Sequence, residues 1–385
     1  MAVRLVDTPE DFQGLLGEIR GAGLVALDTE AASFHRYHDR IYLVQLSTPE
    51  LTAVIDPLSV GDLTPRGDLL ADPGIEKVFH DADYDLRLLD RQFGFRAKRL
   101  FDTRIAAQFL NEPGIGLGAL LEKYFGVVAD KRFQRADWSA RPLSAAMLEY
   151  AAGDTTNLCE LQFILRKRLT ELGRISWVME EFTLLEGTRW TAPDADPELD
   201  YLRLKGAKAL DRRSLALLRE LHGWRAQAAA SLDRAEFRLI GNEVLLHLAQ
   251  HPVATARELA AVKGVGREIL ERRGEEILQA ISRGQSVPDA ELPRLPRPAR
   301  RSSDPAFDLR LEALKKGRNA AAERLALAPG VLCPNGTLEA IARAAPENLA
   351  ALASVAGVRQ WQLEVLGEEL LAAMHAVQPI VAEEA

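Results

Sequence analysis

Four carboxylates in the first half of the chain stand beside segments patterned like strands and helices. Asp28 and Glu30 follow the apolar run V-A-L, Asp85 stands at a helix start, and Asp154 lies on a long helix. Residues two apart in a strand project from the same face, so Asp28 and Glu30 point the same way. Magnesium prefers octahedral oxygen ligands, and phosphodiester-cutting enzymes hold two such ions roughly 3.5–4 Å apart with acids from separate elements. The four acids fit that need, although each alone could be a helix cap or a surface charge.

Other polar residues give less specific signals. His35 and His38 are spaced like a metal pair, but no third ligand accompanies them, and a solvated loop is the favoured interpretation. His80 could contact substrate or be a hydrogen-bonded structural histidine. Asp102 is predicted to cap a helix, and the alternative is that it serves as a fifth metal ligand. The segment starting at Gly264, G-V-G, fits a phosphate-binding hairpin and a plain tight turn equally well.

Composition narrows the class of protein. A chain of 385 residues has room for two or three domains. No apolar run approaches the roughly 18 residues of a membrane span, and the N-terminus lacks the apolar core of a secretory signal, so we expect a cytoplasmic protein without membrane association. Cys159 and Cys333 lie far apart without a Cys/His cluster, which excludes a zinc ribbon and disfavours a disulfide. The net charge of −8 argues against a wholly basic surface but permits a local basic patch.

The elements that must position the four acids are a sheet and its helices. Short aliphatic and β-branched runs predict three antiparallel strands, the last two of which are joined by a hairpin at 47–50. A further strand and an amphipathic helix follow, and then a short strand that leads into a capped helix. These elements are expected at Leu24–Leu27, Ile41–Leu46, Leu51–Ile55, Lys77–Phe79, Tyr84–Phe93, Leu100–Phe101 and Arg104–Leu110. A helix ending at Gly126 follows, and then one long helix over Ser144–Leu172.

Between these last two helices lies the segment 130–142, which is basic and aromatic and has no amphipathic period. It is therefore expected to be a surface loop. Its Lys131, Arg132, Arg135 and Arg141 could hold phosphates, or the loop could simply be solvated.

The C-terminal half is predicted to be helical and duplicated. A polar, proline-bearing joint at Pro193–Pro197 marks a domain boundary. Beyond it, one constant offset pairs Arg225 with Arg318, Asn242 with Asn335, and Gly264 with Gly357. Two copies of one small helical domain follow from this repeat. The proline- and arginine-bearing segment between them is expected to be a semi-extended linker that either contacts a polyanion or is solvated.

Three motifs carry a family resemblance. V-A-L-D-T-E (25–30), F-H-D-A-D-Y-D-L-R-L-L (79–89) and Y-A-A-G-D-T (150–155) resemble the exonuclease motifs of the Tyr-containing DEDD superfamily. The loop at 130–142 is similar to that of the ribonuclease D family, and the repeated units resemble the HRDC domain. The resemblance spans essentially the whole chain. It implies an α/β ribonuclease-H-like (DnaQ-like) exonuclease domain at 1–192, a first all-α HRDC-like domain at 198–285, a Pro/Arg-rich linker at 286–305 and a second HRDC-like domain at 306–378.

The resemblance also implies an activity: a 3′→5′ exoribonuclease that trims the 3′ ends of structured RNA such as tRNA precursors, with two divalent ions (Mg²⁺ or Mn²⁺), release of 5′-mononucleotides and no obligate protein partner. The resemblance implies that Tyr150 orients the attacking water. This role suits a phenol, because a group with a pKa near 10 is mostly protonated at pH 7 and is a poor base. The same resemblance implies four metal ligands, Asp28, Glu30, Asp85 and Asp154, of which Glu30 is also expected to be catalytic. The residues expected to contact RNA are Thr29, Lys131, Gln134, Arg135 and Arg141.

Two positions depart from the family pattern, Ala31 where Phe is usual and Gly153 where Ala is common, and neither removes a ligand. Two other functions stay open. One is a DNA 3′→5′ exonuclease, which would use the same acids. The other is a non-catalytic RNA-binding scaffold, against which the retention of all four acids and Tyr150 weighs.

Overall fold

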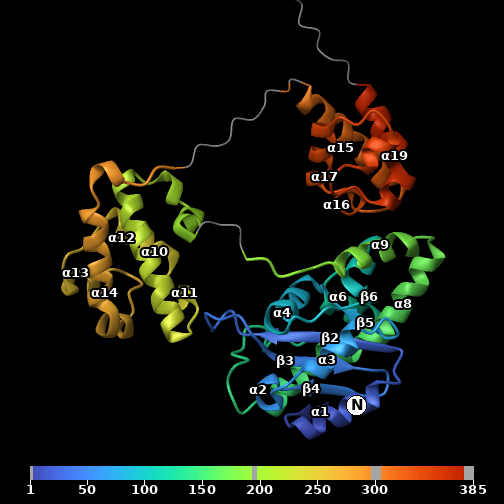
Figure 1. The fold of residues 1–385 in the computed structure, drawn as a ribbon, viewed down its shortest axis with the longest axis horizontal. Helices are drawn as coiled ribbons and strands as arrows, with labels where there is room; N and C mark the ends of the chain where they lie inside the picture. Colours follow the sequence, from blue (N-terminus) through green and yellow to red (C-terminus); the bar gives the residue numbers. More distant parts are fainter. Residues whose placement is uncertain (1–2, 193–196, 296–303, 305, 377–385) are drawn as a thin grey trace, which may run out of the picture.

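The N-terminal part of the molecule is built on one six-stranded mixed sheet (Figure 1). The computed structural model describes residues 3–192, 197–295, 304 and 306–376. The strands lie in the order β1-β4-β3-β2-β5-β6. Their bounds are β1 Val3–Val6, β2 Leu24–Ala31, β3 Ile41–Ser47, β4 Thr52–Ile55, β5 Glu76–Phe79 and β6 Leu100–Asp102. β2, β3 and β4 pair antiparallel, as predicted, whereas β1 pairs with β4, β5 with β2, and β6 with β5, each in parallel.

Nine helices within residues 3–192 surround this sheet. They are α1 Pro9–Ile19, α2 Pro57–Val60, α3 Thr64–Ala71, α4 Asp83–Phe93, α5 Thr103–Phe109, α6 Leu117–Phe125, α7 Ala145–Thr156, α8 Leu158–Glu171 and α9 Ile175–Leu185. Alternate residues of β3 serve two cores. Leu43 belongs to the cluster that includes Ala151 and Ala152 of α7, and Val44 belongs to the main core of the domain.

Two sequence expectations about these elements were wrong, and two elements were missed. β2 runs on to Ala31, so Asp28 and Glu30 lie within the strand and not beyond its end. The long helix over 144–172 is two helices that meet at Asn157, because Thr155 and Thr156 direct their hydroxyls to the carbonyl of Ala152 and are weak helix formers. The strand β1 was not predicted, because four residues carry too little periodic signal. The helix α1 was also missed, although its Thr8 cap and the helical spacing of Phe12, Leu15, Leu16 and Ile19 were available signals.

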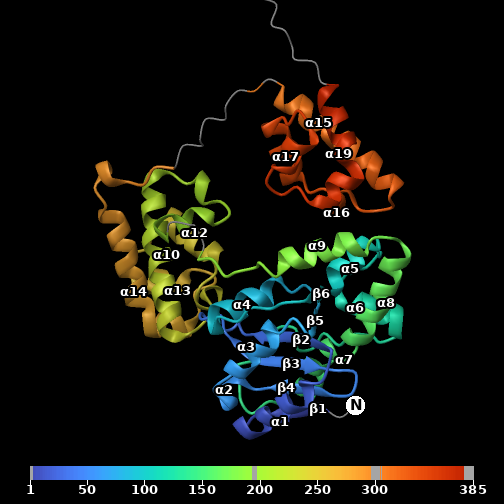
Figure 2. The same cartoon turned by 45° about the vertical axis from the view of Figure 1, so that its right-hand side comes forward.

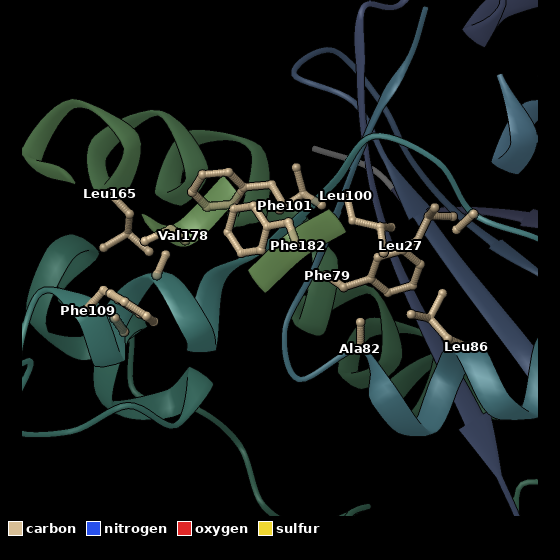
Figure 3. Packing of buried hydrophobic residues seen from close by; sticks show 14 of the residues in the cluster. Leu27, Phe79, Ala82, Leu86, Leu100, Phe101, Phe109, Leu165, Val178 and Phe182 are labelled. Carbon is tan, nitrogen blue, oxygen red and sulfur yellow. The ribbon is translucent and has the colours of Figure 1, made fainter. Parts of the chain in front are cut away.

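Aromatic packing ties the sheet to the helices that carry the motifs. Figure 3 shows Leu27 and Phe79 from adjacent strands beside Leu86 of α4. Further along the same core, the rings of Phe101 and Phe182 lie 4.9 Å apart. This packing fixes α4 against β2 and β5, and with it the start of α4, where Asp85 lies.

The C-terminal half consists of two helical units (Figure 2). The first contains α10 Arg212–Leu232, α11 Glu236–Leu239, α12 Asn242–Gln250, α13 Ala256–Ala261 and α14 Arg267–Ser286, with 3₁₀ helices at Pro197–Arg203, Ala207–Ala209 and Asp289–Glu291. The second contains α15 Phe307–Arg324, α16 Pro329–Leu332, α17 Asn335–Ala344, α18 Leu349–Ala353 and α19 Gln360–His375. The linker expected at 286–305 lies partly outside the described residues, as do residues 377 and 378, and the domain limits stay predictions.

The repeat is confirmed by matched hydrogen bonds in the two units. Arg225 and Arg318 are both buried, and each donates from Nη1 to an asparagine Oδ1 at 2.7 Å, Asn242 in the first unit and Asn335 in the second. Gly264 and Gly357 adopt positive φ angles of 96° and 89°. Only glycine enters that region without steric cost, which explains why both copies have glycine at this turn.

Both helical units contact the exonuclease part. The backbone N–H of Ala235 donates to the carbonyl of His35 at 3.0 Å, so the first unit packs on the β2–β3 loop. In the second unit, Trp361 stacks on Trp177 of α9 with ring centroids 5.4 Å apart. Glu180 of α9 accepts hydrogen bonds from the first N–H groups of α19. In the described parts of the chain, no helix is both long and apolar enough to cross a bilayer.

Candidate active site

Three of the four predicted acids come together beneath α7. Asp28 and Glu30 project from β2, and Asp154 projects from α7, which packs on β2 and β3. One carboxylate oxygen from each of these three residues lies within 4.8 Å of the others. Three carboxylate oxygens at this separation are a donor set for a hard divalent cation.

Asp85 stands next to this group, at the N-terminal end of α4. Its carboxyl is buried and accepts a hydrogen bond from the Thr29 hydroxyl, and Thr29 lies between Asp28 and Glu30 in β2. The Asp85 charge is the second cause, after burial, that raises the pKa of Asp28. Asp85 therefore belongs electrostatically to the same site, and Thr29 has a structural partner there.

The pKa values of the four carboxyls show that burial and mutual repulsion disfavour their charged forms. Burial, and then the Asp154 and Asp85 charges, raise the pKa of Glu30 to about 9. Burial also raises the pKa of Asp85 to about 7 and that of Asp154 to about 6. The pKa of Asp28 is raised as well, by burial and by all three neighbours. A divalent cation removes this mutual repulsion, so the four residues fit a metal site.

Tyr150 lies one helical turn before Asp154. Two aromatic residues of the 130–142 loop hold its ring, Phe133 at 5.7 Å and Trp138 at 5.9 Å between ring centroids. Burial, and then the charges of Asp154 and Glu30, raise the pKa of Tyr150 above its ordinary value. The phenol stays protonated at neutral pH and can donate a hydrogen bond, but it cannot act as a base.

Asp102 and His80 have structural roles. Asp102 caps α5, since its carboxylate accepts the N–H groups of Arg104 and Ile105, and it also accepts the N–H of Ala82 just before α4. The cap interpretation was right. His80 pairs with the hydroxyl of Thr103 at 2.9 Å, and burial lowers its pKa to about 4. It is therefore neutral near pH 7.

The segment at 130–142 is a loop, as predicted, and its polar residues differ in what they contact. Lys131 and Gln134 are exposed. Arg135 is also exposed, with its guanidinium 5.3 Å from the centre of the Phe34 ring. Arg141 makes a two-pronged ion pair with Asp56 at 2.6 and 2.9 Å and also donates to backbone carbonyls. An RNA contact by Arg141 would have to compete with these bonds.

Sequence reasoning missed how the first helical unit reaches this region. The β2–β3 loop with His35 and His38 was expected to be solvated, but Asp233 accepts the N–H of His38 at 3.0 Å. Arg238 donates to the carbonyl of Phe34 at 2.7 Å, and its guanidinium lies 5.2 Å from the Phe34 ring. Arg135 and Arg238, from two parts of the chain, thus share one aromatic ring. The aromatic residue Phe34, close to His35 and His38 in a loop, was the one sequence signal that this loop has a packing partner.

Known proteins with similar sequences and structures show where the chain belongs. The 3'-5' exonuclease family matches residues 3–170, and the HRDC domain family matches residues 214–281 and 308–374. Ribonuclease D of Granulibacter bethesdensis is 35% identical over 96% of this chain and 91% of that protein. The chain belongs to the ribonuclease D family.

Other relatives of this family agree. Ribonuclease D of Escherichia coli is 31% identical over 76% of this chain and 78% of that protein. The crystal structure of Escherichia coli RNase D, described as an exoribonuclease involved in structured RNA processing, matches with a TM-score of 0.69 and 26% identity, over 98% of this chain and all of that one. The catalytic core of RRP6 from Trypanosoma brucei matches at 29% identity with a TM-score of 0.67, over 74% of this chain and 79% of that one.

The expected fold class and enzyme class are therefore confirmed. The chain is a 3′→5′ exoribonuclease of ribonuclease D type, with an exonuclease domain followed by two HRDC domains. Its family is metal-dependent, and the group formed by Asp28, Glu30 and Asp154 is a site in this chain that could hold a metal ion.

Proposed function

We propose that this ribonuclease D trims the 3′ ends of structured RNA such as tRNA precursors by two-metal hydrolysis and releases 5′-mononucleotides. The single observation that carries the mechanism is the convergence of Asp28, Glu30 and Asp154 within 4.8 Å, with Asp85 beside them. Two divalent ions, Mg²⁺ or Mn²⁺, would supply the Lewis acidity that lowers the pKa of water and stabilises the leaving 3′-oxygen.

The protein's own residues hold and orient the reactants in this proposal. Asp28, Glu30, Asp85 and Asp154 are the ligands, and Thr29 fixes the Asp85 carboxyl by its hydrogen bond. The phenol of Tyr150, protonated and in contact with the rings of Phe133 and Trp138, orients the attacking water. Proton acceptance by Tyr150 is not part of the mechanism, because its pKa is raised and not lowered.

The path of the RNA is proposed along the 130–142 loop. Lys131, Gln134 and Arg135 are exposed there, and Arg135 lies over the Phe34 ring just after the β2 ligands. Cations on an exposed loop suit phosphates. The contacts predicted for Thr29 and Arg141 would require those side chains to leave Asp85 and Asp56, so we rank them below the other three.

The test compares a structured RNA bearing a single-stranded 3′ extension with a DNA of the same sequence, with Mg²⁺ or with chelator. We expect metal-dependent loss of single nucleotides from the RNA 3′ end. Faster degradation of the DNA would favour a DNA exonuclease. Tight RNA binding without hydrolysis in either metal would favour a scaffold.

A further inference from the structure

A fully buried glutamine lies beside the carboxylate group. Gln45 of β3 has no exposed surface, and neither its Nε2 nor its Oε1 has a hydrogen-bond partner. Within the described residues it is the one side chain whose amide is buried and unpaired at both atoms. Such a group costs free energy in the folded state, and an apolar side chain of similar length would fill the same space without that cost.

The sheet register places Gln45 directly opposite Asp28. Opposed residues of antiparallel strands project from the same face, with Cβ atoms about 4.5–5.5 Å apart. That face is covered by α7. Leu43, two residues before Gln45, packs with Ala151, and the hydroxyl of Ser47, two residues after it, lies 2.8 Å from that of Thr155. Gln45 therefore projects from the sheet face that α7 covers, with Asp28 opposite it on one neighbouring strand and the apolar Val54 opposite it on the other.

A carboxylate that ligates a cation through one oxygen is oriented by a donor to the other oxygen. The amide of Gln45 has two N–H donors, and the Asp28 carboxylate is the acceptor on the neighbouring strand. We propose that Gln45 is a positioning residue, whose amide donates to Asp28 and holds that carboxylate in the metal-ligating orientation. The inference rests on the proposed metal-dependent function. The structure shows no hydrogen bond between the two side chains, so the proposed bond would form when a bound cation reorients the Asp28 carboxylate, and it would give the buried amide the partner it lacks.

The test uses Gln45→Met, which keeps the length of the side chain and removes the amide. Mn²⁺ affinity of the full chain is measured by calorimetry without RNA, and thermal unfolding is measured in chelator. We expect Mn²⁺ affinity to fall about 10- to 100-fold, the range seen when a partner of a metal ligand is removed. The unfolding midpoint in chelator should be unchanged or raised, because an unpaired buried amide has been removed.

The matched control is Gln162→Met. Gln162 is also buried, but its amide donates to Glu76 at 3.0 Å, away from the site. This variant should lower the unfolding midpoint and leave Mn²⁺ affinity unchanged. A Gln45→Met variant that behaves in the same way would overturn the proposal and make Gln45 a packing residue.

A second measurement places the effect on Asp28. In the Asp28→Asn background, Gln45→Met should not weaken Mn²⁺ binding further, because the oriented carboxylate is already gone. An equal loss in both backgrounds would contradict the proposed contact. Failure of the unaltered chain to bind Mn²⁺ at all would instead contradict the proposed metal-dependent function.

Discussion

Removing one carboxylate should stabilise the metal-free enzyme, and Glu30→Gln is the sharpest case. The pKa of Glu30 is raised from 4.5 to about 9 in the folded protein, by burial and by the charges of Asp154 and Asp85. Below pH 4.5 the Glu30 carboxyl is protonated in both the folded and the unfolded chain, so it does not lower the free energy of unfolding. Above pH 4.5 it ionises in the unfolded chain but stays protonated in the folded chain, and the free energy of unfolding therefore falls until about pH 9.

The size of the penalty follows from this range. Each pH unit above 4.5 lowers the free energy of unfolding by about 1.4 kcal/mol, so Glu30 would lower it by about 3 kcal/mol at pH 7. Glu30 is partly exposed and water screens its charge, so we expect Glu30→Gln to add about 1–3 kcal/mol to the unfolding free energy at pH 8 relative to pH 5. In saturating Mg²⁺ or Mn²⁺ the order should reverse, because the ions stabilise the unaltered protein through Glu30.

The assay is urea unfolding in chelator at pH 5 and pH 8, followed by hydrogen exchange of peptides from β2 and α7. Exchange reports on the exonuclease domain alone, which matters because a three-domain chain does not unfold in two states. Glu149→Gln is the control, since Glu149 is exposed on α7 beside Tyr150. Equal gains for both variants, or a loss for Glu30→Gln at pH 8, would refute the argument from burial and repulsion.

Three further predictions address the site and its approach. Tyr150→Phe should keep Mn²⁺ and RNA binding and lower the single-turnover rate by roughly 10²–10⁴; weaker binding with an unchanged rate would make Tyr150 a packing residue. Gly153→Ala should raise the unfolding free energy by up to about 1 kcal/mol with activity kept, because an added Cβ meets no atom within 4 Å; a stability loss would show strain at this turn of α7. Arg135→Ala should weaken RNA binding and reduce the log–log salt slope by about 1, and Arg132→Ala should have a smaller effect on the slope because its guanidinium is already paired with Asp130; an unchanged slope for Arg135→Ala would remove Arg135 from the RNA path.

The sequence supported the fold wherever periodicity was strong. β3 and β4 with their hairpin, α4, and the duplicated helical units all came from regular apolar spacing and turn residues, and the shared Arg225 and Arg318 bonds show why the repeat was readable. Two features escaped for different reasons. The break at Asn157 depends on local bonds from threonine hydroxyls to the backbone, which the apolar spacing of the helix does not reveal, and the strand β1 depends on its pairing with the distant strand β4.

The site shows the same division. The proximity of Asp28, Glu30 and Asp154 could be predicted, because each acid stands in a recognisable motif, and the ligand roles of these residues and of Asp85 stay a prediction. The arrangement around them could not. That Thr29 bonds to Asp85, and that Gln45 faces Asp28, follow from strand register and helix packing. The approach of Arg238 to Phe34 joins residues 204 positions apart and leaves no local pattern.

The central claim is that four acids of this ribonuclease D hold two divalent ions at the scissile phosphate. The most direct test is a crystal structure of the enzyme with Mn²⁺ and a non-hydrolysable RNA 3′ end, with the ions located by anomalous scattering. We expect two anomalous peaks about 3.5–4 Å apart among Asp28, Glu30, Asp85 and Asp154. Peaks away from these carboxylates, with the RNA 3′ end bound elsewhere, would contradict it.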